Sequence, residues 1–368
     1  MRRIANVTLL LAVLLLCAGQ GWAESWQQAV SSRVTTEYET NPAMLAAHSG
    51  GVWLAVFEPG YRLTGRVGES EISTGLALQV ARSSNKTLNP DRDSPSVFLN
   101  WMRQTGAGEF RIGTRYAELA TRDAGGVDAT GVPASSTRTS RAASGSWAME
   151  LSERASSSID AAYERVSYNR GPYTDYSTRS GGVRINYVLS EQTTSFFRVS
   201  GNKYLPADGG PSSSLRNATL GMNWKFEYID WSLEVGEARV GGGDAEREGS
   251  VEMHYAGQRA QMTLNAGRRV APSGLGGFIK TDQATAGWHY ALSEYSNAGI
   301  DLERQRNLST TMGGDIVSTS SGVWLDHSLT PFWRTRTYYR HRTNRGGGVA
   351  GASSNLLGFS IAYDYSDF

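Results

Sequence analysis

The feature that most constrains the fold is an alternation of apolar and polar residues that continues to the end of the chain. The segment from Glu71 to Val80 shows it, with apolar side chains at Ile72, Leu76, Leu78 and Val80 among small or polar ones. Successive side chains of an extended chain point to opposite faces, so such a strand has one apolar and one polar face. Beyond residue 23, no apolar run approaches the roughly 20 residues of a membrane helix. Backbone polar groups in a bilayer must be paired within the protein, so the pattern predicts a membrane β-barrel.

A secreted soluble β-sandwich or β-helix is the alternative fold. A sandwich needs two inner faces and open edges, and many strands in one sandwich are unusual. A membrane barrel explains why each strand has one apolar and one polar face, since one faces lipid and the other faces the lumen. We therefore expect a barrel.

The first 23 residues have the composition of an export signal. Arg2 and Arg3 form a basic start, an apolar core runs from Val7 to Cys17, and the small residue Ala23 ends the segment. We expect cleavage after residue 23, which leaves a single barrel domain over residues 24–368. Lipidation at Cys17 is disfavoured because Leu16 precedes it, where a small side chain is required. Cleavage removes the only cysteine, so the mature chain forms no disulfide.

Charge and motif content argue against several functions. Removing Arg2 and Arg3 from the 36 basic residues leaves 34 against 35 acidic residues, a net charge of −1, so no general basic field attracts nucleic acid. The five histidines are scattered singly and match no zinc or hydrolase motif. They are His48, His254, His289, His327 and His341. We expect no enzyme activity, no cofactor and no metal site.

Turn residues divide the mature chain into about eighteen strand-like segments, with 16 as the lower bound. Each is long enough to cross a bilayer at a tilt. They are 26–41, 51–64, 70–83, 95–105, 109–122, 137–151, 156–169, 175–189, 193–204, 214–225, 228–239, 246–256, 258–270, 278–291, 296–306, 315–328, 332–344 and 354–368. Tight turns alternate with longer polar loops such as 42–50, 123–136, 271–277, 307–314 and 345–353. This alternation predicts short periplasmic turns, long extracellular loops and both termini in the periplasm.

The apolar phase predicts the lipid-facing residues. They are Ile72, Leu76, Leu78, Val80, Val97, Leu99, Trp101, Phe110, Ile112, Tyr116, Val183, Ile185, Tyr187, Leu189, Leu220, Met222, Trp224, Trp231, Leu233, Val235, Leu357, Phe359, Ile361, Tyr363 and Tyr365. The polar phase contains charges that would be costly in hydrocarbon, so we expect them to face the lumen. It includes Glu71, Ser73, Gln79, Arg111, Arg115, Asp160, Glu164, Arg184, Asn186, Arg259, Gln261, Thr263, Asn265, Asp301, Glu303, Arg334, Arg336, Arg340 and Arg342.

The segment 332–342 has the most distinctive polar face, because four arginines and Tyr338 share one phase. A row of guanidinium groups could pass carboxylate or phosphate groups from one to the next. The alternatives are ion pairs with Asp301, Glu303, Asp326 and Asp364 that only hold the wall, or contact with lipopolysaccharide near a rim. The candidate lumen contacts for an anion or sugar are Arg334, Arg336, Arg340, Arg342, Arg111, Arg115 and Arg184.

Two segments carry a family resemblance. The striped strand from Leu357 to Tyr365 and the terminal Phe368 are similar to the signature by which bacterial outer-membrane barrels are recognised for insertion, although Phe368 is out of phase with the stripe. The opening segments 34–42 and 57–63 resemble the β-barrel porins encoded with exopolysaccharide systems. This resemblance implies a wide barrel for polymer export in the outer membrane of a Gram-negative bacterium.

We therefore expect an outer-membrane channel that passes a hydrophilic solute, with an exported exopolysaccharide favoured. The expected partners are outer-membrane lipid and lipopolysaccharide, the barrel-insertion machinery, an acidic polysaccharide and periplasmic export components. A general or anion-selective diffusion porin is the close alternative. A non-conducting barrel that scaffolds an envelope assembly is the alternative from a different class.

Overall fold

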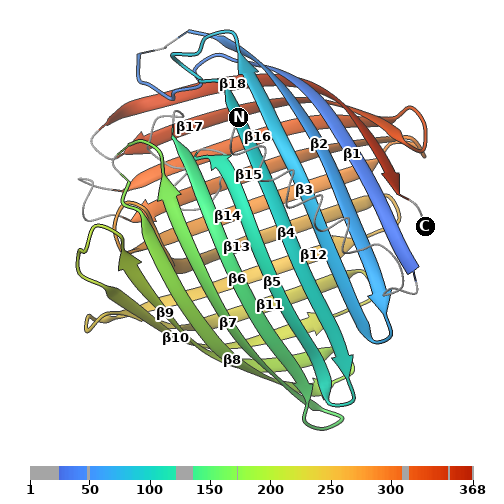
Figure 1. Ribbon diagram of the computed structural model, residues 1–368, viewed down its shortest axis with the longest axis vertical. Coiled ribbons are helices and arrows are strands. Elements are labelled where there is room, and N and C mark those ends of the chain that lie inside the picture. The colour runs from blue at the N-terminus through green and yellow to red at the C-terminus, as the bar shows by residue number, and fades with distance from the viewer. Residues whose placement is uncertain are drawn as a thin grey trace.

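A computed structural model describes residues 25–47, 50–121, 136–171, 173–308, 315–346 and 349–366. They form eighteen antiparallel strands of one sheet that closes on itself, because each strand pairs with the next and β1 also pairs with β18 (Figure 1). The strands are β1 Ser25–Glu39, β2 Val52–Val67, β3 Ser70–Ser83, β4 Arg92–Thr105, β5 Gly108–Ala120, β6 Thr137–Glu150, β7 Ala155–Tyr168, β8 Tyr176–Ser190, β9 Thr193–Pro206, β10 Ser213–Lys225, β11 Ile229–Val240, β12 Ala245–Ala256, β13 Ala260–Pro272, β14 Phe278–Ala291, β15 Ser296–Leu308, β16 Ile316–Ser328, β17 Trp333–Gly346 and β18 Val349–Ser366.

The closed eighteen-stranded barrel predicted from the sequence is confirmed. The bounds of β3 and β14 agree with the prediction, and most other ends differ by only a few residues. Closure pairs the backbone groups of both terminal strands, so the sheet has no free edge. Among the described residues, no helix is long and apolar enough to cross a membrane.

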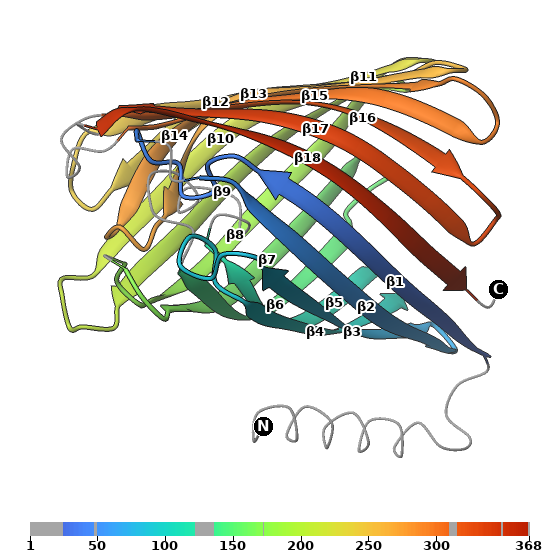
Figure 2. The same ribbon diagram turned by 90° about the horizontal axis from the view of Figure 1, so that it is seen from above.

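The connections differ between the two rims. Tight turns such as 68–69 and 106–107 lie on one rim, and longer connections such as 84–91 and 169–175 lie on the other. Ala29 of β1 pairs with Ser366 of β18, so both ends of the barrel chain lie near the rim with the tight turns (Figure 2).

One predicted loop is wrong. The segment 345–353 is mostly strand, because β17 continues to Gly346 and β18 resumes at Val349. Gly346 has φ +102°, a left-handed conformation that glycine adopts without a steric penalty and that a tight hairpin requires. The predicted signal segment 1–23, the terminal Phe368 and nearly all of the loop 123–136 lie outside the described residues.

The two faces of each strand differ as the alternation predicts. In β18, the lipid-facing Leu357 is 56% exposed, whereas its neighbour Leu356 is 3% exposed. The buried side chains lie on the inner wall rather than in a central core. They include one cluster of Leu54, Val56 and Ala81, and another of Val166, Tyr176 and Tyr204. The lumen is therefore narrowed by side chains rather than left as an open tube.

Candidate functional site: the lumen

The arginines of β17 line one wall of the lumen. Arg334, Arg336, Arg340 and Arg342 border a cavity of about 380 Å³, together with Tyr338 of the same strand. Residues of β1–β4, β15, β16 and β18 complete its lining, among them Glu37, Glu58, Trp324, Asp326 and Asp364. The cavity is polar and carries both signs of charge.

Three of the four arginines have acidic partners. Arg336 makes two hydrogen bonds to the carboxylate of Asp326 on β16, at 2.5 and 2.7 Å. Arg334 lies 3.7 Å from Asp364, and Arg342 lies 3.9 Å from Glu39. Asp326 is only 8% exposed, so its charge needs the Arg336 guanidinium.

Arg340 differs from the other three. Within the described part of the chain it has no ion-pair partner, and its guanidinium Nε lies near Gly322 of β16, which carries no side chain and separates Arg340 from Asp301 of β15. The wall therefore combines paired arginines, which hold neighbouring strands together, with one cation that is available to a solute.

Tyr338 connects the arginine wall to the seam between β18 and β1. It pairs with Gly358 of β18, and its hydroxyl donates a hydrogen bond to the Glu37 carboxylate of β1. A Cβ at Gly358 would lie 2.2 Å from the Tyr338 ring, so only glycine lets the ring lie flat across β18. Ser354 of β18 likewise donates to Glu39 of β1 at 3.2 Å.

A repeated stack of arginine, aromatic ring and glycine lies along the lumen. The Arg184 guanidinium carbon is 3.6 Å from the centroid of Phe196, and that ring lies over Gly221 of β10. Two further stacks have the same order: Arg62 at 5.6 Å from Phe98 over Gly75, and Arg336 at 4.6 Å from Trp324 over Gly299. Cation–π attraction orients each arginine over its ring and leaves the guanidinium edge available for hydrogen bonds.

The inward positions of Phe98, Phe196 and Trp324 were missed at the sequence level. Each shares a phase with polar lumen residues, which is the signal that could have identified it. The facing glycine depends on strand register, and register cannot be read from one strand alone.

The remaining predicted arginines lie on other parts of the wall. Arg111 of β5 pairs with Glu109 of the same strand, and Arg184 of β8 donates to Asn186 at 2.8 Å. Arg115 of β5 has no ion-pair partner among the described residues and is exposed. Arg111, Arg115 and Arg184 do not join the cavity that the β17 arginines border.

A contact between distant strands narrows the lumen near the rim with the longer connections. The Thr174 amide, between β7 and β8, donates to the Gly274 carbonyl between β13 and β14 at 2.7 Å. Phe278, at the start of β14, packs on the cluster of Val166, Tyr176 and Tyr204, and its ring centroid is 6.1 Å from that of Tyr204. Four strands separate β9 from β14 along the wall, so the connection 273–277 bends inward to make this contact.

The polar connection between β3 and β4 lies at the same rim, the one with the longer connections. Asp91 accepts a hydrogen bond from the Ser83 amide at 3.0 Å and pairs with Lys86 at 2.9 Å. These interactions, the Ser83 amide first, hold the pKa of the Asp91 carboxyl below its usual range, so it is ionised at neutral pH. It is followed directly by Arg92, which lines the cavity of the arginine wall.

Acidic side chains gather on the opposite side of the ring. Asp230 and Glu234 of β11 and Glu248 and Glu252 of β12 lie in the inward phase of these strands. In the ring of eighteen, β11 and β2 are nine strands apart and therefore face each other. This acidic arc thus faces β2, which carries the inward Arg62, and it lies five to six strands around the ring from the arginines of β17. No cluster of three or more His, Cys, Asp or Glu within the described ranges is arranged to hold a metal ion.

The fold is that of outer-membrane proteins of known structure. No protein-family model and no curated protein sequence matches the chain. The outer-membrane protein OpdK of Pseudomonas aeruginosa superposes with a TM-score of 0.55 at 11% identity, covering 94% of this chain and 100% of that chain. A structure of OpdK with vanillate gives 0.54 at 11% identity, with the same coverage. OccAB4 of Acinetobacter baumannii gives 0.52 at 10% identity, covering 94% of this chain and 99% of that chain. At this identity the likeness shows the fold alone, a closed β-barrel of the kind found in outer-membrane proteins.

Proposed function

We propose that the chain is an outer-membrane diffusion channel that favours small organic anions. The observation that carries this proposal is Arg340, a cation without an ion-pair partner among the described residues, beside a polar cavity of about 380 Å³. A guanidinium presents a fork of donors that matches a carboxylate. Neighbouring ion pairs hold the wall around it, so a bound anion meets an ordered site and is still released into the lumen.

The arginine stacks refine the solute class. In each stack the aromatic face is covered by a guanidinium. The Arg336 edge already binds Asp326, and Arg184 Nε binds Asn186. Arg62 is therefore the stacked arginine whose edge can bind a carboxylate while the surrounding wall contacts a flat ring. OpdK has been crystallised with vanillate, an aromatic carboxylate. Aromatic carboxylates are therefore the first solutes to test.

Planar bilayer conductance with the purified barrel tests this proposal. Under a salt gradient, the wild type is expected to show a reversal potential on the anion-selective side, and benzoate is expected to reduce the chloride current. Arg340→Gln should weaken both effects, whereas Arg345→Gln, at an outward position of the same strand, serves as the matched control. Equal selectivity in the wild type and Arg340→Gln would contradict the role of Arg340, and cation selectivity in the wild type would contradict the proposed function.

Export of an acidic exopolysaccharide is the second candidate. It is supported by the resemblance of the opening segments and by the basic wall. The contact between Phe278 and Tyr204 favours small solutes, because an extended polymer would need more open cross-section at that level. Release of an acidic oligosaccharide from liposomes that contain the barrel would support export, and retention with free passage of benzoate would support the porin.

The remaining expectations form part of the same proposal. A cleaved signal over residues 1–23 would deliver the chain across the inner membrane of a Gram-negative bacterium, and the insertion machinery would recognise Phe368. Periplasmic export components are partners only of the polysaccharide candidate. A barrel that folds in bilayers but never conducts would instead support the scaffold role.

A further inference from the structure

A row of six cations lies on the outer face of six consecutive strands. We call this row the basic belt, and it consists of Arg141, Arg165, Arg179, Lys203, Arg216 and Arg239. All six are exposed, and the chain neighbours of five of them are buried on the lumen side: Val166, Thr178, Tyr204, Leu215 and Ala238. Because successive side chains alternate between the faces, the cations point away from the lumen.

Strand register sets these cations directly opposite one another. Arg141 pairs with Arg165, Arg179 with Lys203, and Arg216 with Arg239. Side chains at paired positions lie about 5 Å apart at Cβ, and like charges there destabilise a sheet. Three such pairs in succession imply a partner that neutralises them.

The protein itself does not supply that partner. None of the six cations has an ion pair among the described residues, and Arg141 lies 5.8 Å over the Tyr116 ring. The outward acids nearby are engaged or face another arginine: Glu118 accepts a hydrogen bond from Tyr116, and Glu237 pairs in register with Arg247.

The other side of the barrel neutralises its outer charges internally. Arg268 of β13 bonds Asp282 of β14 through two contacts of 2.5 and 2.9 Å, and Arg306 of β15 bonds Asp315 at 2.9 Å. Single outward arginines such as Arg304 of β15 and Arg345 of β17 also lack an ion-pair partner among the described residues, but consecutive strands with directly opposed cations are a property of β6–β11.

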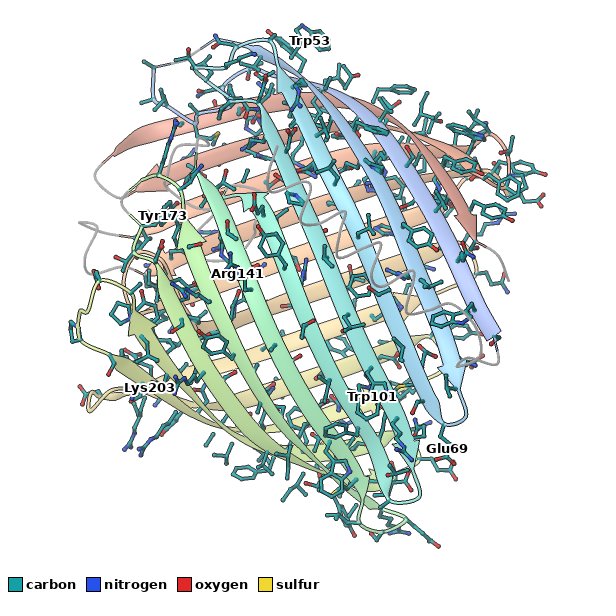
Figure 3. The ribbon with its side chains drawn as sticks, in the orientation of Figure 1. Trp53, Glu69, Trp101, Arg141, Tyr173 and Lys203 are labelled. Atoms are coloured by element: carbon teal, nitrogen blue, oxygen red, sulfur yellow. The ribbon has the colours of Figure 1, made fainter. Side chains whose placement is uncertain are left out.

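The basic belt lies at the height of a membrane interface. Figure 3 places Arg141 and Lys203 toward the rim with the longer connections, away from Glu69 in the turn between β2 and β3. On β10, about eight residues separate Arg216 from Trp224 near the other rim. At about 3.3 Å per residue and a tilt of about 40°, this is roughly 20 Å along the membrane normal. Exposed apolar side chains such as Leu220 and Val235 fill the band between these two levels.

We propose that the basic belt binds the phosphate groups of lipopolysaccharide in the outer leaflet. Arginine matches phosphate through paired hydrogen bonds, and the apolar band below would contact the acyl chains of the same molecule. A free phosphate ion would contact only the cations and would make no use of the apolar band. A lipid that carries both groups accounts for the unpaired charges and for their position directly above the apolar surface.

Retention of purified lipopolysaccharide by the detergent-solubilised barrel tests this proposal, measured as lipid phosphate per barrel after size exclusion. Replacing all six belt cations by Gln is expected to weaken retention at least tenfold, because each Lys or Arg near an anionic lipid surface adds to the binding free energy. Raising NaCl from 0.1 to 1 M should weaken retention by the wild type. The matched control, Arg268→Gln with Asp282→Asn, removes an outer ion pair at the same rim and should leave retention unchanged.

Two outcomes would overturn the proposal. The first is equal retention by the wild type and the six-residue variant. The second is full displacement of the lipid by an equal concentration of inorganic phosphate, which would show that the belt binds free phosphate. If the six-residue variant fails to fold, the Arg216→Gln, Arg239→Gln double variant replaces one opposed pair and should still lose retention several-fold. Bilayer conductance of the folded variants should not change, because the belt lies outside the lumen.

Discussion

At the scale of single residues, Arg336 shows that a lumen arginine can be structural. Its guanidinium bonds the nearly buried Asp326 carboxylate. Arg336→Gln leaves that charge unpaired and should lower the free energy of unfolding by about 1–3 kcal/mol, the smaller values following from the partial exposure of Arg336. The midpoint of heat-modifiable gel migration measures this loss. Arg340→Gln breaks no ion pair of the described residues and should leave the midpoint nearly unchanged; an equal drop in both variants would refute this division of roles.

Gly358 is the other residue whose replacement has a specific consequence. A Cβ there would overlap the Tyr338 ring, which can move only into the lumen. Gly358→Ala should therefore break the Tyr338–Glu37 hydrogen bond, cost about 1–2 kcal/mol and reduce single-channel conductance. Gly322→Ala is the control, because a Cβ at Gly322 meets its nearest atom, the Tyr339 carbonyl oxygen, at 3.4 Å. Unchanged conductance in Gly358→Ala would show that the Tyr338 ring does not limit the pore.

At the scale of elements, the strands could be predicted and their lateral neighbours could not. A period of two and the turn residues locate each strand, which is why β3 and β14 match their predicted bounds. The contact of Phe278 with Tyr204 depends on how the connection 273–277 bends after the barrel has closed, and no local pattern encodes that bend. The expectation that charged side chains face the lumen was also incomplete, because their cost applies only inside the hydrocarbon layer. Arg179 and Arg216 lie on the outer face near the strand ends.

The inward bend of the connection 273–277 leads to a prediction about pore width. Phe278→Ala removes the ring that packs on Tyr204, so single-channel conductance should rise while stability falls by up to about 2 kcal/mol. Phe332→Ala, which removes an exposed aromatic ring at the rim with the tight turns, should leave conductance unchanged. A conductance in Phe278→Ala at or below that of the wild type would place the narrowest section elsewhere.

At the scale of the whole molecule, the two charged walls act together. The arginines of β17 and the acidic arc on β11 and β12 lie five to six strands apart around one lumen, and both act on the ions that pass between them. The preference for anions is therefore the difference between two opposing contributions. Closure of the ring creates this arrangement, because it sets strands that are distant in the sequence around one lumen.

The acidic arc should therefore reduce the anion preference that the arginines produce. Glu234→Gln with Glu252→Gln should shift the reversal potential further toward the anion-selective side, and the shift should shrink between 0.1 and 1 M salt as the screening length falls from about 10 to about 3 Å. Glu237→Gln, at an outward position of β11, is the control and should cause no shift. If neutralising the inward pair leaves the reversal potential unchanged at low salt, the arc lies too far from the ion path to matter, and the field of the arginine wall alone sets the selectivity.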